Sequence, residues 1–444
     1  PEGGGVVNVA SHAFTPRVGL VGGLLVSVSY FVTSAISTVS GVVYIGSVLP
    51  WFDSHIASVA CATLVALALI NIVGIRESAM LSLFMAGAAL LVNVCVISVT
   101  MLSIGPGEWS ELLSRAFTTH DTSTRTLLIG YSSAWLAFSG LESISQLSPA
   151  MKLPIQSTAR RGMKLVVGTM LISSPFLTLF SVELLPELIK RDELKQERFI
   201  SELAGAYGGL PLRISVVATA SSLLLLAANT AIIGSYHVFL ALADAHFLPE
   251  PLMLRNRRFG TPHYAILVAT LVPSLVIAAT GRDLVLLGDL YAFGLLGAFV
   301  LTSLGLDVTR WREHERGRKF WVGAFATLMV VVAWFTCLMV KQEASIFGGF
   351  LVVIGLLLAV GTQQKWFTDM LYGAPAIARR AREAIAESES ELEATSREVL
   401  SLAQAVALTQ LYPSHTLLGL RTANDSLVQE AILREKGLGG TTVY

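Results

Sequence analysis

Long apolar runs separated by short polar segments dominate the chain. A helix needs about 20 apolar residues to cross the hydrocarbon core of a bilayer. A transmembrane β-barrel does not fit, because its strands are runs of about 10 residues with alternating polarity. The pattern therefore predicts an all-α integral membrane protein. Ten segments qualify as spans: 18–49, 54–74, 78–104, 125–147, 163–185, 211–245, 262–281, 284–306, 320–340 and 344–362.

Composition supports this prediction and narrows the function. Of the 444 residues, 53% are hydrophobic and only 14% are charged, whereas soluble domains carry about a quarter charged residues. The formal net charge is zero, which argues against a nucleic-acid partner. Catalytic, nucleotide-binding and metal-binding motifs are missing from the spans, and the three cysteines show no metal-ligand spacing. We therefore expect a transporter without enzymatic activity, cofactor or metal.

Basic residues predict the orientation, because Lys and Arg favour cytoplasmic loops. The loops after the fourth, sixth and eighth spans fall on one side if the ten spans alternate, and so does the C-terminus. We expect that side to be the cytoplasm and the protein to lie in the cell membrane. Segment 187–199 is an exception, since it carries basic residues on the opposite side. The basic residues of the three loops are Lys152, Arg160, Arg161, Lys164, Arg255, Arg257, Arg258, Arg310, Arg312, Arg316, Arg318 and Lys319.

The first span carries a stripe of small and hydroxyl-bearing residues. Ser29, Thr33, Ser37 and Gly41 recur every four residues, which places them on one helix face. Such a stripe either forms a packing seam between helices or lines a solute cavity. The neighbouring Tyr30 is bulky and polar, and we favour a cavity-lining role for it.

The fourth span contains the strongest functional signal. Ser139 and Gly140 interrupt the helix about halfway along, and Glu142 follows them. Broken helices in a membrane are tolerated where their exposed backbone lines a cavity. Burial raises the pKa of a carboxyl group, so Glu142 is a candidate proton carrier near neutral pH. The alternative is a structural Glu that is hydrogen-bonded to another helix.

Other polar positions give weaker signals. Asn229 and Thr230 lie midway along the sixth span, where hydrogen bonds between helices explain them better than solute binding does. Tyr291 lies in the outer half of the eighth span, with Asp289 two residues before it.

Three stretches carry a resemblance to a known family: NIVGIRESA (71–79), AFSGLESISQLSPAMKLPIQSTARRGMK (137–164) and ANTAIIGSYHVFLALADAHFLP (228–249). They resemble the amino acid–polyamine–organocation (APC) superfamily of transporters, and the likeness covers about 1–362. It implies an inverted-repeat helical bundle in which the ten spans are helices three to twelve. Two helices would then be absent, and we expect an unfilled groove lined by Tyr30, Ser139 and Glu142.

Within that superfamily the chain is similar to KUP-type potassium–proton importers with a cytoplasmic universal-stress-type domain. The likeness implies substrate-binding roles for Tyr30, Thr33, Ser37, Ser139, Gly140 and Tyr291, with Glu142 coupling to protons. One position departs from the pattern, because Ser29 stands where those importers carry an Asp. A missing carboxylate weakens a site for a bare cation and leaves room for a neutral or zwitterionic solute.

The composition changes after the last span, which predicts three regions. Residues 1–362 form the transmembrane transporter domain and 363–413 a cytoplasmic linker helix. Residues 414–444 show a strand–helix–strand order that resembles the start of a universal-stress-type α/β domain, cut short after its first elements. A plain amphipathic tail is the alternative.

These observations favour proton-coupled uptake of an amino acid or similar small amine. A potassium–proton symporter is the alternative, and a membrane sensor or channel regulated by a nucleotide-binding tail is a third hypothesis from another class. The expected partners are the solute, protons and the lipid bilayer, with a homodimer through the cytoplasmic tail as a further option.

Overall fold

The computed structural model describes residues 5–74, 79–118, 123–135, 151, 154–184, 193–281, 283–363, 415–417 and 441–443. The chain divides into two units, 1–366 and 367–444, which are described separately. The elements of the first unit are α1 (Gly5–Ala13), α2 (Pro16–Gly46), η1 (Pro50–Ser54), α3 (Ile56–Val73), α4 (Ala79–Ser103), α5 (Pro106–Thr118), α6 (Thr124–Ala134), α8 (Ile155–Leu184), α10 (Glu193–Glu197), α11 (Phe199–Asp244), η4 (Glu250–Met253), α12 (His263–Thr280), α13 (Leu284–Arg312), α14 (Arg318–Val340) and α15 (Gln342–Gln363).

The observed helices confirm the membrane prediction. Within the described ranges, nine helices are long and apolar enough to cross a bilayer, and they match nine of the ten predicted spans. The predicted fourth span, 125–147, begins in α6, but its residues after 135 lie outside the described part of the chain.

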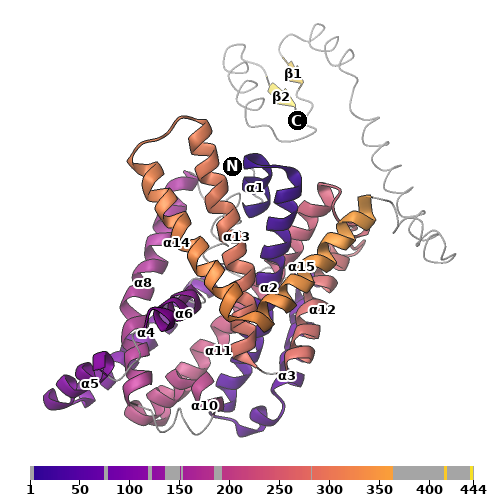
Figure 1. Ribbon diagram of the computed structural model, residues 1–444. Helices are drawn as coiled ribbons and strands as arrows, with labels where there is room; N and C mark the ends of the chain where they lie inside the picture. Colours follow the sequence, from indigo (N-terminus) through magenta and orange to yellow (C-terminus); the bar gives the residue numbers. More distant parts are fainter. Residues whose placement is uncertain are drawn as a thin grey trace. The chain divides into compact units, whose positions relative to one another are not determined.

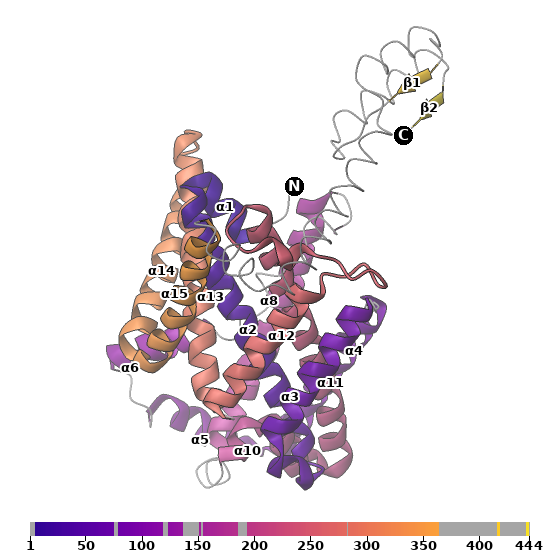
Figure 2. The ribbon, with the colours of Figure 1, turned by 90° about the vertical axis from the view of Figure 1, so that its right-hand side faces the viewer.

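Helices α2 and α13 form the centre of the bundle (Figures 1 and 2). In the most apolar 18-residue stretch of each helix, 89% of the residues are buried in α2 and 67% in α13. The corresponding share is only 17% in α4 and in α8. Helices that are buried on most sides need other helices as neighbours, while the exposed faces of α4 and α8 suit lipid contact. The polar stripe on α2 therefore lies in the interior of the bundle.

Helix α11 is interrupted near its start. Gly209 has φ +69°, a backbone conformation that favours glycine, and Pro211 follows it. The break separates a first segment, 199–208, from a long membrane-spanning segment. It explains why the sequence pattern placed the start of the sixth span at 211.

The two ends of the bundle differ in their neighbours. Gly305 near the end of α13 packs on α1, and Gly23 near the start of α2 packs against Leu242 near the end of α11. The arginine-rich connections after α11 and α13 therefore lie at the end of the bundle that holds α1 (Figure 1). The end of α2, η1 and α10 lie at the other end, which is called the η1 end below.

The second unit contains two short strands among its described residues. β1 (His415–Leu417) pairs in parallel with β2 (Thr441–Val443), with His415 opposite Thr441. Parallel pairing of strands about 25 residues apart agrees with a strand–helix–strand order. The residues between them lie outside the described part, as does the linker helix, so the universal-stress-type domain stays a prediction.

Candidate functional site: a charged cavity

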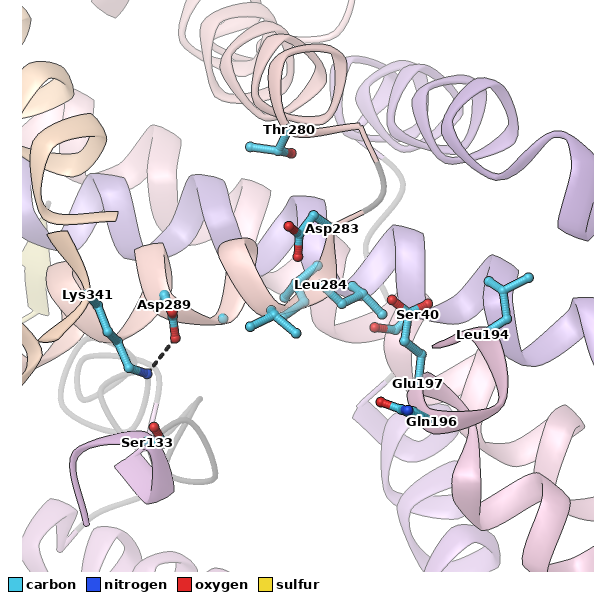
Figure 3. A pocket seen from close by; sticks show the side chains of 13 residues that line it. Ser40, Ser133, Leu194, Gln196, Glu197, Thr280, Asp283, Leu284, Asp289 and Lys341 are labelled. Carbon is cyan, nitrogen blue, oxygen red and sulfur yellow. Dashed lines mark hydrogen bonds and ion pairs between the residues drawn. The ribbon is translucent and has the colours of Figure 1, made fainter. Parts of the chain in front are cut away.

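A cavity of about 870 Å³ opens among α2, α6, α13 and the neighbouring connections (Figure 3). Helix α2 contributes Ile36 and Ser40, and α6 contributes Ser133. The remaining lining residues come from the α10 segment, the end of α12, the start of α13 and the α14–α15 connection: Leu194, Gln196, Glu197, Thr280, Asp283, Leu284, Val285, Gly288, Asp289 and Lys341. All belong to the first unit.

The cavity lies at the η1 end of the bundle, away from the arginine-rich connections. Ser40 is near the end of α2, and Leu284 is the first residue of α13. The orientation predicted from the basic residues would make this cavity open to the outside of the cell, and for that reason we name it the entrance cavity.

Two of the predicted solute-binding residues lie inward of this cavity. Thr33 is about one turn deeper along α2 than Ile36 and shares the face of Ile36 and Ser40, all three being partly exposed. On α13, Tyr291 lies three residues deeper than the lining residue Gly288 and is fully buried. Thr33 and Tyr291 therefore lie deeper along α2 and α13 than the residues that line the cavity.

The expected exposure of Tyr30 in an open groove is wrong. Tyr30 is only 2% exposed because α11 covers it. The fit is tight: a Cβ atom at Gly234 of α11 would lie 2.7 Å from the Tyr30 ring. The glycine lets the two helices approach closely, so this part of the stripe packs between helices. A role for Tyr30 in the solute site stays a prediction.

The other residues of the stripe either pack against α11 or are buried polar groups. Ser37 is 5% exposed, and the carbonyl oxygen of Gly41 accepts a hydrogen bond from the Ser221 hydroxyl at 3.2 Å, which joins α2 to α11. Thr33 donates to the backbone oxygen of Ser29 at 2.8 Å. The Ser29 hydroxyl itself is buried and has no hydrogen-bond partner within the described ranges. A buried hydroxyl without a partner is costly, so Ser29 is a further candidate for solute or water contact.

The predicted break in the fourth span lies outside the described residues, and this includes Ser139, Gly140 and Glu142. The described part, α6, is held against α13 and α14. Tyr131 donates to the backbone oxygen of Met329 at 3.2 Å, and the Trp135 ring meets the Phe299 ring edge to face. These contacts fix the helix that leads into the predicted break and place Ser133 at the cavity wall.

The polar residues of the sixth span, Asn229 and Thr230, form hydrogen bonds to another helix and within their own helix, as expected. Asn71 of α3 donates to the Asn229 side chain at 2.5 Å, and both side chains are buried. Thr230 donates to the backbone oxygen of Leu226 in its own helix at 2.9 Å.

Of the charged side chains in the cavity wall, only Asp289 stood out in the sequence. Asp289 forms an ion pair with Lys341, and Asp283 caps α13 by accepting a hydrogen bond from the Leu286 amide at 2.9 Å. Glu197 adds a third carboxylate. Lys341 and Glu197 were missed because each lies at the end of an apolar or charged stretch, where a solvated side chain is the ordinary expectation. Within the described ranges, His, Cys, Asp and Glu form no group of three that could hold a metal ion.

A buried ion-pair network explains most simply why a basic residue is tolerated in segment 187–199. Arg198, only 7% exposed, donates to both carboxylate oxygens of Asp53 at 2.9 and 3.1 Å and to Glu202 at 3.1 Å. Arg213 donates to the same Glu202 at 2.8 Å. Two acidic partners neutralise the two arginines, and the network ties η1 to the start of α11. Arg198 therefore has a structural role at the η1 end.

Comparison with known proteins adds a family. A family model described as "Amino acid permease" matches residues 1–361. The chain is also similar to the potassium transporter KimA of Bacillus subtilis (strain 168), with 24% identity over 335 residues. Those residues are 73% of this chain and 52% of KimA, so the chain spans about half the length of that curated relative.

Proposed function

The chain belongs to the amino acid permease family and is a multi-pass membrane transporter, and from this we propose that it carries out proton-coupled uptake of an amino acid or similar small amine. Membership of a transporter family agrees with the prediction that the protein is not an enzyme. The proposal places the protein in the cytoplasmic membrane, with the arginine-rich connections and the C-terminus inside the cell.

The charge of the entrance cavity is the observation that carries the proposal. Its wall holds three carboxylates, Glu197, Asp283 and Asp289, against one ammonium group, that of Lys341. A cleft with an excess of one charge and low-dielectric walls concentrates solutes of the opposite charge. Solutes with a positive group are therefore favoured at the entrance, and simple anions are repelled.

Inward of the cavity, the proposed solute site is rich in neutral oxygen atoms. Thr33 and Tyr291 would contact the solute there, and the backbone around Gly140 would hold the solute's carboxylate or amino group. Tyr30, Ser37 and Ser139 complete the set proposed from the sequence. Hydroxyl and backbone groups recognise an amino acid by hydrogen bonds without needing a net charge at the site.

Potassium is the second candidate solute, because KimA is a potassium transporter. The entrance cavity would attract potassium as it would an amine. Ser29 argues for the first candidate, since a hydroxyl at this position supplies an oxygen ligand without the negative charge of a carboxylate.

An uptake assay separates the two solutes. The purified protein, reconstituted in proteoliposomes with an acidic exterior, should accumulate radiolabelled neutral amino acids or methylammonium above protein-free liposomes. Radiolabelled rubidium, a substitute for potassium, should stay near background. Accumulation of rubidium alone would replace the first candidate by the second, and accumulation of neither would reject the proposed function.

Substitution of Glu142 tests the proton coupling. Gln has nearly the same size but cannot carry a proton, so Glu142→Gln should lose accumulation driven by the pH gradient while keeping exchange of labelled for unlabelled solute. The matched control is Glu343→Gln, an exposed carboxylate at the start of α15, which should keep both activities. Gradient-driven accumulation that persists in Glu142→Gln would remove this residue from the mechanism.

A further inference from the structure

An ion pair between Asp289 and Lys341 joins two elements across the wall of the entrance cavity (Figure 3). Asp289 lies on α13, and Lys341 is the single residue between the end of α14 and the start of α15. The Asp289 side chain is 25% exposed and that of Lys341 is 10% exposed. A molecule in the cavity can therefore reach the carboxylate, while the Lys341 stem stays embedded between helices.

The surroundings make this carboxylate a good binding group for a cation. Apolar side chains of Ile36, Leu284 and Val285 line the same cavity, and a lower local dielectric strengthens charge–charge attraction. The other charged groups of the wall, Asp283 and Glu197, lie away from the pair in Figure 3. Both are acidic, so they favour a positive charge in the cavity as well.

On the premise that the chain transports a positively charged or zwitterionic solute, as proposed above, we infer that Asp289 binds the solute's positive charge on its way inward and that Lys341 is a built-in competitor for that carboxylate. The ammonium group of a lysine and the amino group of an amine solute are chemically alike, so a carboxylate that pairs with one suits the other. Asp289 is the innermost of the α13 residues that line the cavity, and its side chain lies on a different face of α13 from that of Tyr291. Entry of the solute then exchanges one cation for another, and no bare carboxylate is left behind.

This exchange predicts opposite effects for the two partners. The apparent affinity for a solute is proportional to the fraction of time that its site is free of the competitor. If Lys341 occupies the carboxylate about nine-tenths of the time, Lys341→Gln should lower the KM for methylammonium by about tenfold. Asp289→Asn removes the binding charge and should raise that KM by about tenfold. The double variant should resemble Asp289→Asn, because the lysine has no effect once the carboxylate is gone.

A purely structural ion pair would give another result. Both single variants would then lose transport and thermal stability together, and the swapped pair, Asp289→Lys with Lys341→Asp, would restore them. That pattern would overturn the inference. The unfolding temperature of each variant in detergent separates a change in KM from a loss of folded protein.

Occupancy can be measured without transport, which separates this inference from the proposed function. Ser133 lines the same cavity as the pair (Figure 3), so Ser133→Cys serves as a reporter in a chain whose Cys61, Cys95 and Cys337 are replaced by alanine. Methylammonium chloride should slow its modification by neutral methyl methanethiosulfonate, and tetramethylammonium chloride, which is bulkier, is the control salt.

Adding Lys341→Gln to the reporter chain should reduce the methylammonium concentration needed for half protection by about tenfold. Such a shift in a protein that transports none of the tested solutes would support the inference while the proposed function fails. Transport with no shift in either KM or protection would overturn the inference and leave the proposed function standing.

Discussion

Replacing Arg198 with alanine is expected to lower the free energy of unfolding by about 3 kcal/mol, because it leaves buried carboxylates without their cation. Asp53 would lose two hydrogen bonds and the positive charge of Arg198, while Glu202 would keep Arg213. Asp53 is 22% exposed, so water offsets part of the loss and the lower end of the usual range applies. The unfolding temperature in detergent, together with a denaturant series, measures the change.

An exposed ion pair in the same chain is the matched control. Arg115 pairs with Glu111 one helical turn away, and their side chains are 52% and 62% exposed. Surface pairs of this kind contribute about 0–1 kcal/mol, so Arg115→Ala should hardly change the unfolding temperature. Equal losses in Arg198→Ala and Arg115→Ala would contradict the structural role of the buried network.

The spans could be predicted because their signal is local. Twenty apolar residues in a row favour a membrane helix wherever the helix packs, and the break in α11 comes from a glycine and a proline two residues apart, Gly209 and Pro211. Nine of the described helices therefore agree with the sequence pattern. What a helix face contacts is a different matter, since it depends on residues far away in the chain.

The stripe on α2 shows this limit. Spacing alone places Ser29, Thr33, Ser37 and Gly41 on one face, but it does not say which of them meets another helix. Gly234 of α11 covers Tyr30, and Ser221 bonds to Gly41, whereas Thr33 is partly exposed and lies one turn inward of Ile36 in the cavity wall. These partners lie about 180 to 200 residues away in the chain. The sequence alone therefore could not distinguish a packing seam from a cavity lining.

The charged contacts were missed for the same reason. Arg198 meets Asp53 across 145 residues, and Lys341 meets Asp289 across 52. In the sequence each lies in or beside a polar loop, where solvation is the simplest interpretation. A basic residue that breaks the positive-inside pattern was the available signal for Arg198, and it indicates that an acidic partner should be sought.

The close approach of α2 and α13 leads to the second large effect. A Cβ atom at Gly294 of α13 would lie 2.8 Å from the backbone oxygen of Leu25 and 2.9 Å from the backbone nitrogen of Ser29. Both are main-chain atoms, so no side-chain rotation relieves the clash and the two central helices must separate. Overpacking costs about 1–3 kcal/mol in ordinary cores, and here we expect Gly294→Ala at the upper end of that range and Gly294→Leu to prevent folding.

The same substitution should impair transport beyond its effect on stability. Gly294 lies less than one turn from Tyr291 on α13, and its contact reaches Ser29, four residues before Thr33 on α2. Separating the helices would therefore move α2 and α13 apart where the proposed solute-binding residues Thr33 and Tyr291 lie. The control is Gly349→Ala in α15, where an added Cβ atom meets nothing within 4 Å. We expect that control to keep wild-type uptake and unfolding temperature, while folded Gly294→Ala protein shows a raised KM. Wild-type KM and stability in Gly294→Ala would show that α2 and α13 can move apart freely and that their contact does not set the geometry of the site.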